Sequence, residues 1–400
     1  MKEILIIGPK YMPIPAVNGG AIEGLIDEYL QYNSNSKKYN ITVYSSLSKD
    51  VNENYNKKYS NTTFRYIKKS GKLHFIHRLV CSVNRRLRKG KQNPTDYTLD
   101  VIADLKKKKE LDKYDLVIIE NQIESIPMYR KYIKSKLVEH LHNDYLNSAT
   151  KEATKLVKMC DEFWGVSNFI CNQINKVDKS VVTKTLYNGI NTNKFSSKIT
   201  DKQKNDMLKK IGFNKNDFIV IYVGRLMPEK GVLELLKAFN KVDKKDNLKL
   251  LVVGGKKSNS TEIDNYYNQL VEEMNKNKES IHMYGKANTD ELRILYSMAK
   301  VQVVPSMWEE AFGLIVVEGM CAMNKMIVTN SGGIPEIVED TAIIVNRENI
   351  VNELTNAIEE IHINEEKYKI DKNKYKKIIS KFDKEKFGEK FEELIGESLK

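Results

Sequence analysis

The chain has 400 residues and a formal net charge of +13; 41% of its residues are hydrophobic and 30% are charged. With a mean hydropathy of −0.50, this composition is that of a soluble globular protein, and the length favours two domains. Apolar runs stay below the roughly 18 residues of a membrane-spanning helix, so we expect no such helix. Residues 1–3 lead directly into a strand, so we expect no signal peptide. The four cysteines are scattered without a Cys-x-x-Cys pair, which argues against a zinc site and predicts free thiols in the cytoplasm.

Apolar strands alternate with helices along the chain. The first series has strands at residues 3–8, 41–44, 116–119, 137–142 and 162–167, with a helix at residues 21–32 after the first strand. The second series has strands at residues 218–224, 248–255, 281–285, 301–305, 326–330 and 342–345. Near-continuous apolar strands separated by helices are typical of parallel sheets buried on both faces. We therefore predict an α/β fold with two Rossmann-like domains, residues 1–190 and 191–370. A final helix at residues 371–400 would carry Phe382, Phe387 and Phe391 on its apolar side.

Positive charge is concentrated in residues 65–91. This segment contains no Asp or Glu and ten basic residues: Arg65, Lys68, Lys69, Lys72, Arg78, Arg85, Arg86, Arg88, Lys89 and Lys91. At helical spacing, an apolar side forms from Phe75, Ile76, Leu79, Val80, Val83 and Leu87. A basic amphipathic segment suits an anionic membrane surface. An ordinary surface helix is the alternative, and nucleic acid is a weaker one because no nucleic-acid-binding motif is recognisable.

Two glycines, Gly19 and Gly20, lie between the first strand and its helix. They would let a ligand approach the backbone closely, although a plain turn is the favoured interpretation of this loop taken alone. The loop is neither a dinucleotide fingerprint nor a P-loop. Further along, His142 ends the strand at residues 137–142. A histidine there is usually structural; a contact with a reacting ligand is the functional alternative, with His140 on the same face as its competitor.

The loop after the strand at residues 218–224 carries two cations, Arg225 and Lys230. Arg225 offers a planar fork to phosphate oxygens and Lys230 a point charge. Open α/β sheets bind ligands at the carboxyl ends of their strands, so these residues predict an anion site. A capped loop with exposed charges is the structural alternative.

Two later loops also follow strands. Lys286 lies after Gly285, where backbone groups could meet a nucleobase, and residues 331–336 contain Gly332 and Gly333 before a helix. For each of these loops taken alone, a tight turn is the favoured interpretation.

Residues 305–318 are the most informative stretch, because a strand is followed by a loop, Gly313 and an apolar helix. Glu310 would lie in the loop and Glu318 about 12 Å further along, at about 1.5 Å per residue. A helix N-terminus presents unpaired N–H groups that suit an anion. A nucleotide-diphosphate-sugar is long enough to reach both carboxylates with its phosphates at the helix start. If only the spacing of Glu310 and Glu318 is considered, the alternative to a ligand site is that both are solvated acids that flank a helix.

Together these motifs resemble the family-4 retaining glycosyltransferases, which have the two-Rossmann architecture called GT-B. The resemblance covers nearly the whole chain and rests on residues 19–20, 167, 187–190, 223–231, 305–318 and 331–336. Residues 11–23 and 141–144 are similar to members that act as spore-coat or surface-polysaccharide transferases. Asn324 stands where the family commonly has Gly, which is tolerable because Asn enters the left-handed region readily.

The resemblance implies a role for each candidate residue. Arg225 and Lys230 would hold the donor diphosphate, with Gly19 and Gly20 beside it and Lys286 near the donor. Glu310 would bind the donor sugar, Glu318 the ribose and His142 the far side of the sugar, so that the catalytic set is His142, Arg225, Lys230 and Glu310. The backbone of Phe312, Gly313, Leu314 and Ile315 would meet the sugar and phosphate. The final helix would cross back onto the first domain.

The reaction expected is transfer of a sugar from a nucleotide sugar, with UDP-sugar favoured, to a hydroxyl of a glycan or lipid-linked acceptor. It would retain the anomeric configuration and serve cell-surface polysaccharide or coat assembly. No Asp-x-Asp motif is seen, so we expect neither metal nor cofactor, with cations stabilising the leaving diphosphate. A nucleotide-sugar epimerase, a phosphorylase and a non-catalytic coat or scaffold protein are the alternatives. The protein would be cytoplasmic, peripheral at the inner face of the membrane, and would bind no nucleic acid.

Overall fold

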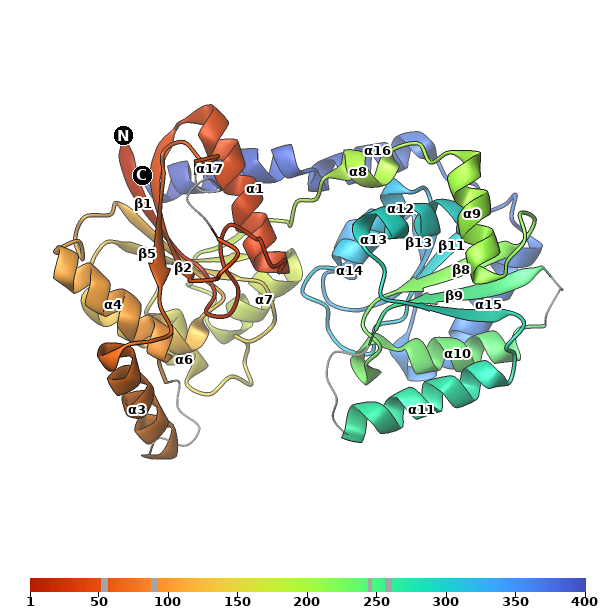
Figure 1. Cartoon of the computed structure of the whole chain (residues 1–400), viewed down its shortest axis with the longest axis horizontal. Coiled ribbons are helices and arrows are strands. Elements are labelled where there is room, and N and C mark those ends of the chain that lie inside the picture. Colours follow the sequence, from red (N-terminus) through yellow and green to blue (C-terminus); the bar gives the residue numbers. More distant parts are fainter. Residues whose placement is uncertain (52–56, 88–92, 244–246, 256–260) are drawn as a thin grey trace. The chain divides into compact units, whose positions relative to one another are not determined.

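The computed structural model describes residues 1–51, 57–87, 93–243, 247–255 and 261–400. They form two compact units, residues 1–189 with 384–400 and residues 190–383 (Figure 1). In the described residues each unit has a parallel sheet with helices on its faces, so the predicted α/β class is confirmed.

In the described residues, the sheet of the first unit has seven parallel strands in the order β3-β2-β1-β4-β5-β6-β7. Their bounds are β1 (Lys2–Ile7), β2 (Tyr39–Ser46), β3 (Thr62–Ile67), β4 (Leu116–Glu120), β5 (Lys136–Leu141), β6 (Glu162–Gly165) and β7 (Thr183–Thr185). The sequence pattern missed β3 and β7, which lie at the two edges and are less buried than the central strands. The strand order reverses between β1 and β4, and such a switch point is where open sheets bind ligands.

The helices of the first unit are α1 (Ala21–Ser36), α3 (Lys72–Leu87), α4 (Asp96–Lys108), α5 (Ile126–Tyr132), α6 (Ala153–Val157), α7 (Asn168–Val177) and α17 (Lys384–Ser398), with the 3-10 turn η1 (Ile123–Ser125). Although far apart in sequence, α1 and α17 lie side by side (Figure 1). The rings of Tyr29 and Phe391 stack there with centroids 3.9 Å apart. These helices cover one face of the sheet, where Ile4, Ile6 and Trp164 are fully buried.

In the described residues, the sheet of the second unit has six parallel strands in the order β10-β9-β8-β11-β12-β13. Their bounds are β8 (Phe218–Val223), β9 (Leu248–Val253), β10 (Ile281–Gly285), β11 (Val301–Val304), β12 (Lys325–Thr329) and β13 (Ala342–Val345). All six were predicted to within two residues at each end. The order reverses between β8 and β11, so the loops after these two strands flank the switch point.

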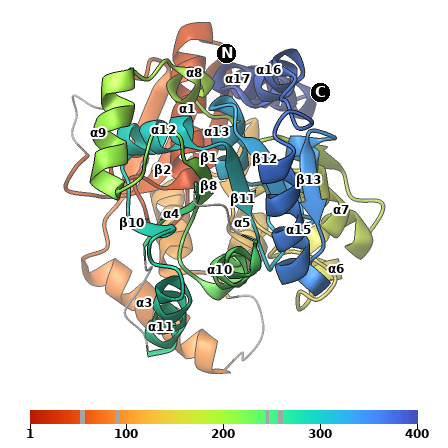
Figure 2. The same cartoon turned by 90° about the vertical axis from the view of Figure 1, so that its right-hand side faces the viewer.

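The helices of the second unit are α8 (Thr192–Ser196), α9 (Asp201–Ile211), α10 (Val232–Lys241), α11 (Thr261–Asn275), α12 (Thr289–Met298), α13 (Leu314–Cys321), α14 (Ile334–Val338), α15 (Ile350–Ile363) and α16 (Lys372–Ile379). Short 3-10 turns are η2 (Pro228–Lys230), η3 (Arg347–Asn349) and η4 (Ser380–Phe382). Figure 2 shows α9 and α12 on one side of the sheet and α10 and α11 on the other.

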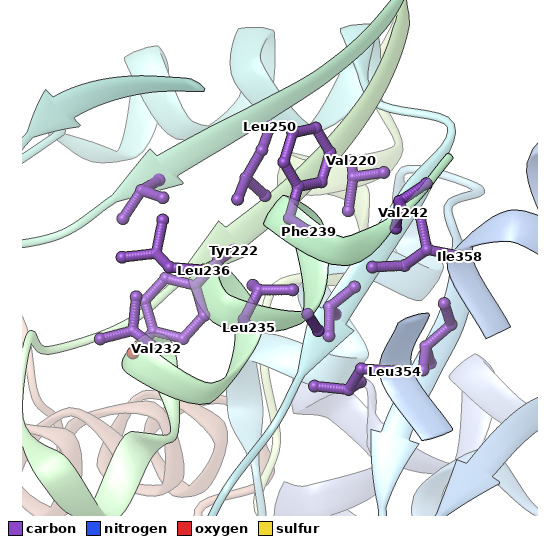
Figure 3. Close-up of a cluster of buried hydrophobic side chains, with 14 of the residues drawn as sticks. Val220, Tyr222, Val232, Leu235, Leu236, Phe239, Val242, Leu250, Leu354 and Ile358 are labelled. Carbon is purple, nitrogen blue, oxygen red and sulfur yellow. The ribbon is translucent and has the colours of Figure 1, made fainter. Parts of the chain in front are cut away.

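Alternate residues of β8 face opposite sides of the second sheet. Val220 and Tyr222 pack with α10 and α15, around Phe239 and Leu354 (Figure 3). The intervening Ile219, Ile221 and Val223 pack instead with α9 and α12. A strand apolar at every position is therefore explained by a helix layer on each face.

The C-terminal segment differs from the single helix predicted for residues 371–400. It forms α16, then η4 and then α17, and Asp383 lies in extended backbone between η4 and α17. Asp383 forms a β-bridge with Ile190, whose N–H donates to the carbonyl oxygen of Phe382 at 2.9 Å. This pairing takes the chain out of the helix. Phe382 consequently packs against Phe312 in the second unit, while α17 belongs to the first.

The left-handed residue expected at Asn324 lies one position earlier. Met323 has φ +61, and Asn324 is instead buried, with its amide donating to the carbonyl oxygens of Tyr296 and Ala299 at 2.9 Å each. The expected role of Asn324 in the turn was therefore wrong. Its side chain ties the turn after α13 to the end of α12.

Candidate functional site

Glu310 and Lys230 form an ion pair in the second unit, across the two loops that flank its switch point. The Lys230 Nζ lies 2.6 Å from Glu310 Oε1, and the Ser306 hydroxyl donates to the same oxygen at 2.6 Å. Both side chains of the ion pair are mostly buried, and the ammonium also lies 5.3 Å from the ring centroid of Trp308. The structure thus joins two predicted site residues that are 80 positions apart.

Gly231 lets these loops pack closely. It has φ +68, and a Cβ at this position would lie 1.8 Å from the carbonyl oxygen of Pro305. The N–H of Met307 also donates to the carbonyl oxygen of Glu229 at 2.9 Å. A glycine after Lys230 is therefore required by backbone contact and by a positive φ.

Arg225 begins the same loop, directly after β8 and Gly224. Its carbonyl oxygen accepts a hydrogen bond from the Tyr222 hydroxyl at 2.8 Å, which holds the backbone in place. Across the described ranges, no ion pair of its guanidinium is found. Arg225 thus retains its donors for an anion, whereas Lys230 shares its charge with Glu310.

α13 begins after Gly313, which has φ +129. Residues 310–313 are consequently not helical, so the distance of about 12 Å expected between the carboxylates, which assumed a continuous helical rise, does not apply. Leu314 and Ile315 begin the first turn, and their N–H groups have no partner within their own helix. The ring of Phe312 is buried, so Phe312 can offer a ligand only its backbone.

Glu318 lies on the second turn of α13, where it accepts a hydrogen bond from the Tyr296 hydroxyl at 3.1 Å. Burial raises the pKa of its carboxyl to about 7, against a smaller lowering by the Tyr296 hydrogen bond. Glu318 is therefore partly protonated at neutral pH. An incoming hydroxyl that donates a hydrogen bond would favour its ionised form.

The loop that contains Gly332 packs against the backbone of Glu310. Gly332 has φ +53, and a Cβ there would lie 2.0 Å from the carbonyl oxygen of Glu310. That oxygen accepts from the N–H of Gly333 at 2.8 Å, and the N–H of Glu310 donates to the Ser331 hydroxyl at 3.3 Å. The close approach predicted at these glycines is therefore to the backbone of Glu310. Lys286, also predicted in the site, is exposed after β10.

In the first unit, Gly19 and Gly20 lie exposed before α1, both with positive φ. A Cβ on Gly20 would lie 2.2 Å from Glu23 Oε2, so a carboxylate lies beside this helix start. Burial raises the pKa of Glu23, which lowers the charge that a diphosphate would meet there.

His142 follows β5 and shares a buried carboxylate with His140. Glu120 Oε2, at the end of β4, accepts from His142 Nε2 at 2.8 Å and from His140 Nδ1 at 3.0 Å. The neighbouring Asn121 accepts from the His142 N–H at 3.1 Å. Burial alone would raise the pKa of Glu120, but His140 and then His142 lower it to about 2. Burial and His140 lower the pKa of His142 to about 4, so His142 is neutral at physiological pH.

Sequence reasoning missed Glu120. The available signal was a glutamate at the end of an apolar strand, and in the parallel register it pairs directly with His140. In the described part of the chain, Glu120, His140 and His142 are the group whose metal-binding atoms lie within 4.8 Å of one another. Their separations are those of hydrogen bonds from two imidazoles to one carboxylate.

Comparison with known proteins adds to this geometry. Residues 203–378 match the family model described as glycosyl transferases group 1. The uncharacterized glycosyltransferase MJ1607 of Methanocaldococcus jannaschii is 30% identical over 42% of this chain and 41% of its own length. Spore coat protein SA of Bacillus subtilis is 24% identical over 84% of this chain and 83% of its own length.

Among solved structures, Anabaena Alr3699/HepE in complex with UDP and glucose superposes with a TM-score of 0.72 at 16% identity. The superposition covers 99% of this chain and 100% of that chain, which extends the similarity of fold to both units. Residues 203–378 of the second unit therefore match the glycosyl transferases group 1 model, and the chain as a whole has the GT-B fold of glycosyltransferase structures.

Proposed function

We propose that this protein is a retaining glycosyltransferase of family 4, which transfers a hexose from a nucleotide-diphosphate-sugar to a hydroxyl group. The donor is a UDP-sugar, and the acceptor is a glycan or a lipid-linked saccharide in cell-surface polysaccharide or coat assembly. The observation that carries the proposal is the Lys230–Glu310 ion pair at the switch point of the unit that matches the group 1 model, in which Arg225 and Lys230 lie in the same loop. The UDP complex of Alr3699/HepE and the spore-coat name of the Bacillus subtilis relative support the donor and the setting.

The chemistry follows from where charge develops. When the glycosidic bond to the diphosphate breaks, negative charge grows on the leaving phosphate, and Arg225, Lys230 and the first N–H groups of α13 stabilise it. Glu310 receives the sugar hydroxyls, and its ion pair keeps Lys230 in position until the donor arrives. The leaving phosphate removes the proton from an acceptor that attacks the same face of the sugar, so that the configuration is retained without a metal ion.

The test is the double variant Arg225→Ala/Lys230→Ala. Each lost charge contact is expected to lower transfer by about 10²-fold or more, mainly in kcat. Lys300→Ala is a matched control, because Lys300 forms its ion pair with Glu365 at the surface. Transfer by the double variant at the rate of this control would remove both cations from the proposed site.

Two alternatives predict different ligand behaviour. A non-catalytic coat or scaffold protein of this fold would bind neither UDP- nor GDP-sugars in a calorimetric titration. A nucleotide-sugar epimerase would bind the donor and convert it without an acceptor. A transferase should release nucleotide at a rate that rises when membrane extract supplies the acceptor.

The proposed place of the reaction is the cytoplasmic face of an anionic membrane, where a lipid-linked acceptor would be presented. Every helix in the described residues is too short or too polar to cross a bilayer. The proposal accordingly needs a peripheral binding surface, and α3 has the required properties.

A further inference from the structure

α3 turns His74, His77 and Cys81 toward the rest of the first unit. His74 Nδ1 and His77 Nδ1 each lie 2.6 Å from a carboxylate oxygen of Asp100 on α4, and Cys81 is buried further along the same side. These residues recur at intervals of three and four, which define one face of a helix. Imidazoles of α3 therefore contact a carboxylate of α4, and the Cys81 thiol donates to the carbonyl oxygen of Pro94, just before α4.

The apolar residues of α3 point outward. Each of six large side chains is between 43% and 59% exposed: Leu73, Phe75, Ile76, Leu79, Val80 and Val83. We call these six side chains the outer face of α3. A surface helix normally buries its apolar side against its own domain, and a contiguous exposed patch of this kind marks an interaction site.

Positive charge surrounds the outer face. Lys68, Lys69, Lys72, Arg78 and Arg86 are all exposed, and the sequence from residue 65 to residue 91 holds no acid. Arg88, Lys89 and Lys91, which were predicted to contribute, lie outside the described residues. The acids near α3, Asp96 and Asp100, face its inner side.

We propose that the outer face of α3 binds an anionic lipid bilayer, with the helix lying in the plane of the membrane surface. The six apolar side chains would enter the boundary between headgroups and acyl chains, and the flanking Lys and Arg would contact lipid phosphates. The combination of charges and apolar groups selects this occupant. A second copy of the face would bring like charges together, and nucleic acid would leave the aliphatic side chains in water.

The test is co-sedimentation of the full chain with phosphatidylcholine vesicles, with and without phosphatidylglycerol. We expect binding only when phosphatidylglycerol is present, and weaker binding as salt is raised. Phe75→Ser/Leu79→Ser should weaken binding about tenfold or more, because two inserted side chains are lost. Val271→Ser removes an exposed apolar side chain from α11 and should leave binding unchanged.

Several outcomes would overturn the proposal. One is that the wild-type chain does not sediment with phosphatidylglycerol vesicles at low salt. Another is that Phe75→Ser/Leu79→Ser binds these vesicles as well as Val271→Ser does. Lipid-free self-association that the same double variant abolishes would assign the face to a second copy instead. An unchanged melting temperature in the double variant shows that it is folded, since both side chains are exposed. The assay contains no sugar, so its result is independent of whether the chain is a glycosyltransferase.

Discussion

Glu318→Gln should stabilise the second unit at neutral pH and remove part of its pH dependence. The carboxyl pKa rises from 4.5 to about 7 on folding, so between these values the native chain keeps a proton that the unfolded chain has lost. The stability that the protonated Glu318 contributes is therefore complete below pH 4.5 and decreases as the pH rises to about 7. Above that pH the contribution is lost and no longer changes. The shift of about 2.5 units corresponds to an upper limit of about 3 kcal/mol. Water reaches part of this side chain, which reduces the expected effect to about 1–2 kcal/mol.

Urea unfolding at pH 5 and pH 8 measures this effect. The chain has two tryptophans, so a Trp164→Phe background leaves Trp308 as a fluorescence reporter of the second unit. The change in the free energy of unfolding between the two pH values is compared for the proteins with and without Glu318→Gln. The contributions of other titrating groups are the same in both proteins and cancel. Gln can still accept the hydrogen bond from the Tyr296 hydroxyl, so the comparison isolates the proton. An identical loss of stability from pH 5 to pH 8 in both proteins would refute the raised pKa.

Three further predictions concern the site. If ribose hydroxyls donate to Glu318, UDP binding should release a proton near pH 6.5. The calorimetric heat of binding should then depend on the ionisation enthalpy of the buffer. A heat that does not depend on the buffer would show that Glu318 does not contact the nucleotide. Glu120→Gln should lower the pKa of His142 further below about 4, because the carboxylate of Glu120 stabilises the imidazolium and is absent from the variant. An imidazole titration by NMR that is the same in both proteins would contradict this. Gly332→Ala should cost about 1–3 kcal/mol through its positive φ and additionally raise the donor KM, because its added Cβ would displace the backbone of Glu310. Gly212→Ala, which also has a positive φ and whose added Cβ would have nothing within 4 Å, should leave the donor KM unchanged.

Much of the fold followed from local pattern. The unbroken apolar run at residues 218–223 predicted a strand covered on both faces, and Val220 and Ile221 indeed pack against opposite helix layers. Local pattern also located the loops that carry Arg225 and Glu310. It did not predict the break at Asp383, because a helical period cannot reveal that this residue pairs with Ile190.

The sequence by itself determined the strands other than the edge strands β3 and β7, and it determined which loops follow strand ends, since side-chain periodicity is a local property. Tertiary structure alone decided which residues meet. Lys230 reaches Glu310 because β8 and β11 are neighbours in the sheet, and Glu120 reaches two histidines because β4 pairs with β5. It also decided that α3 buries its histidines and exposes its apolar side, because helical spacing defines two faces and only the packing partner selects the one that is buried.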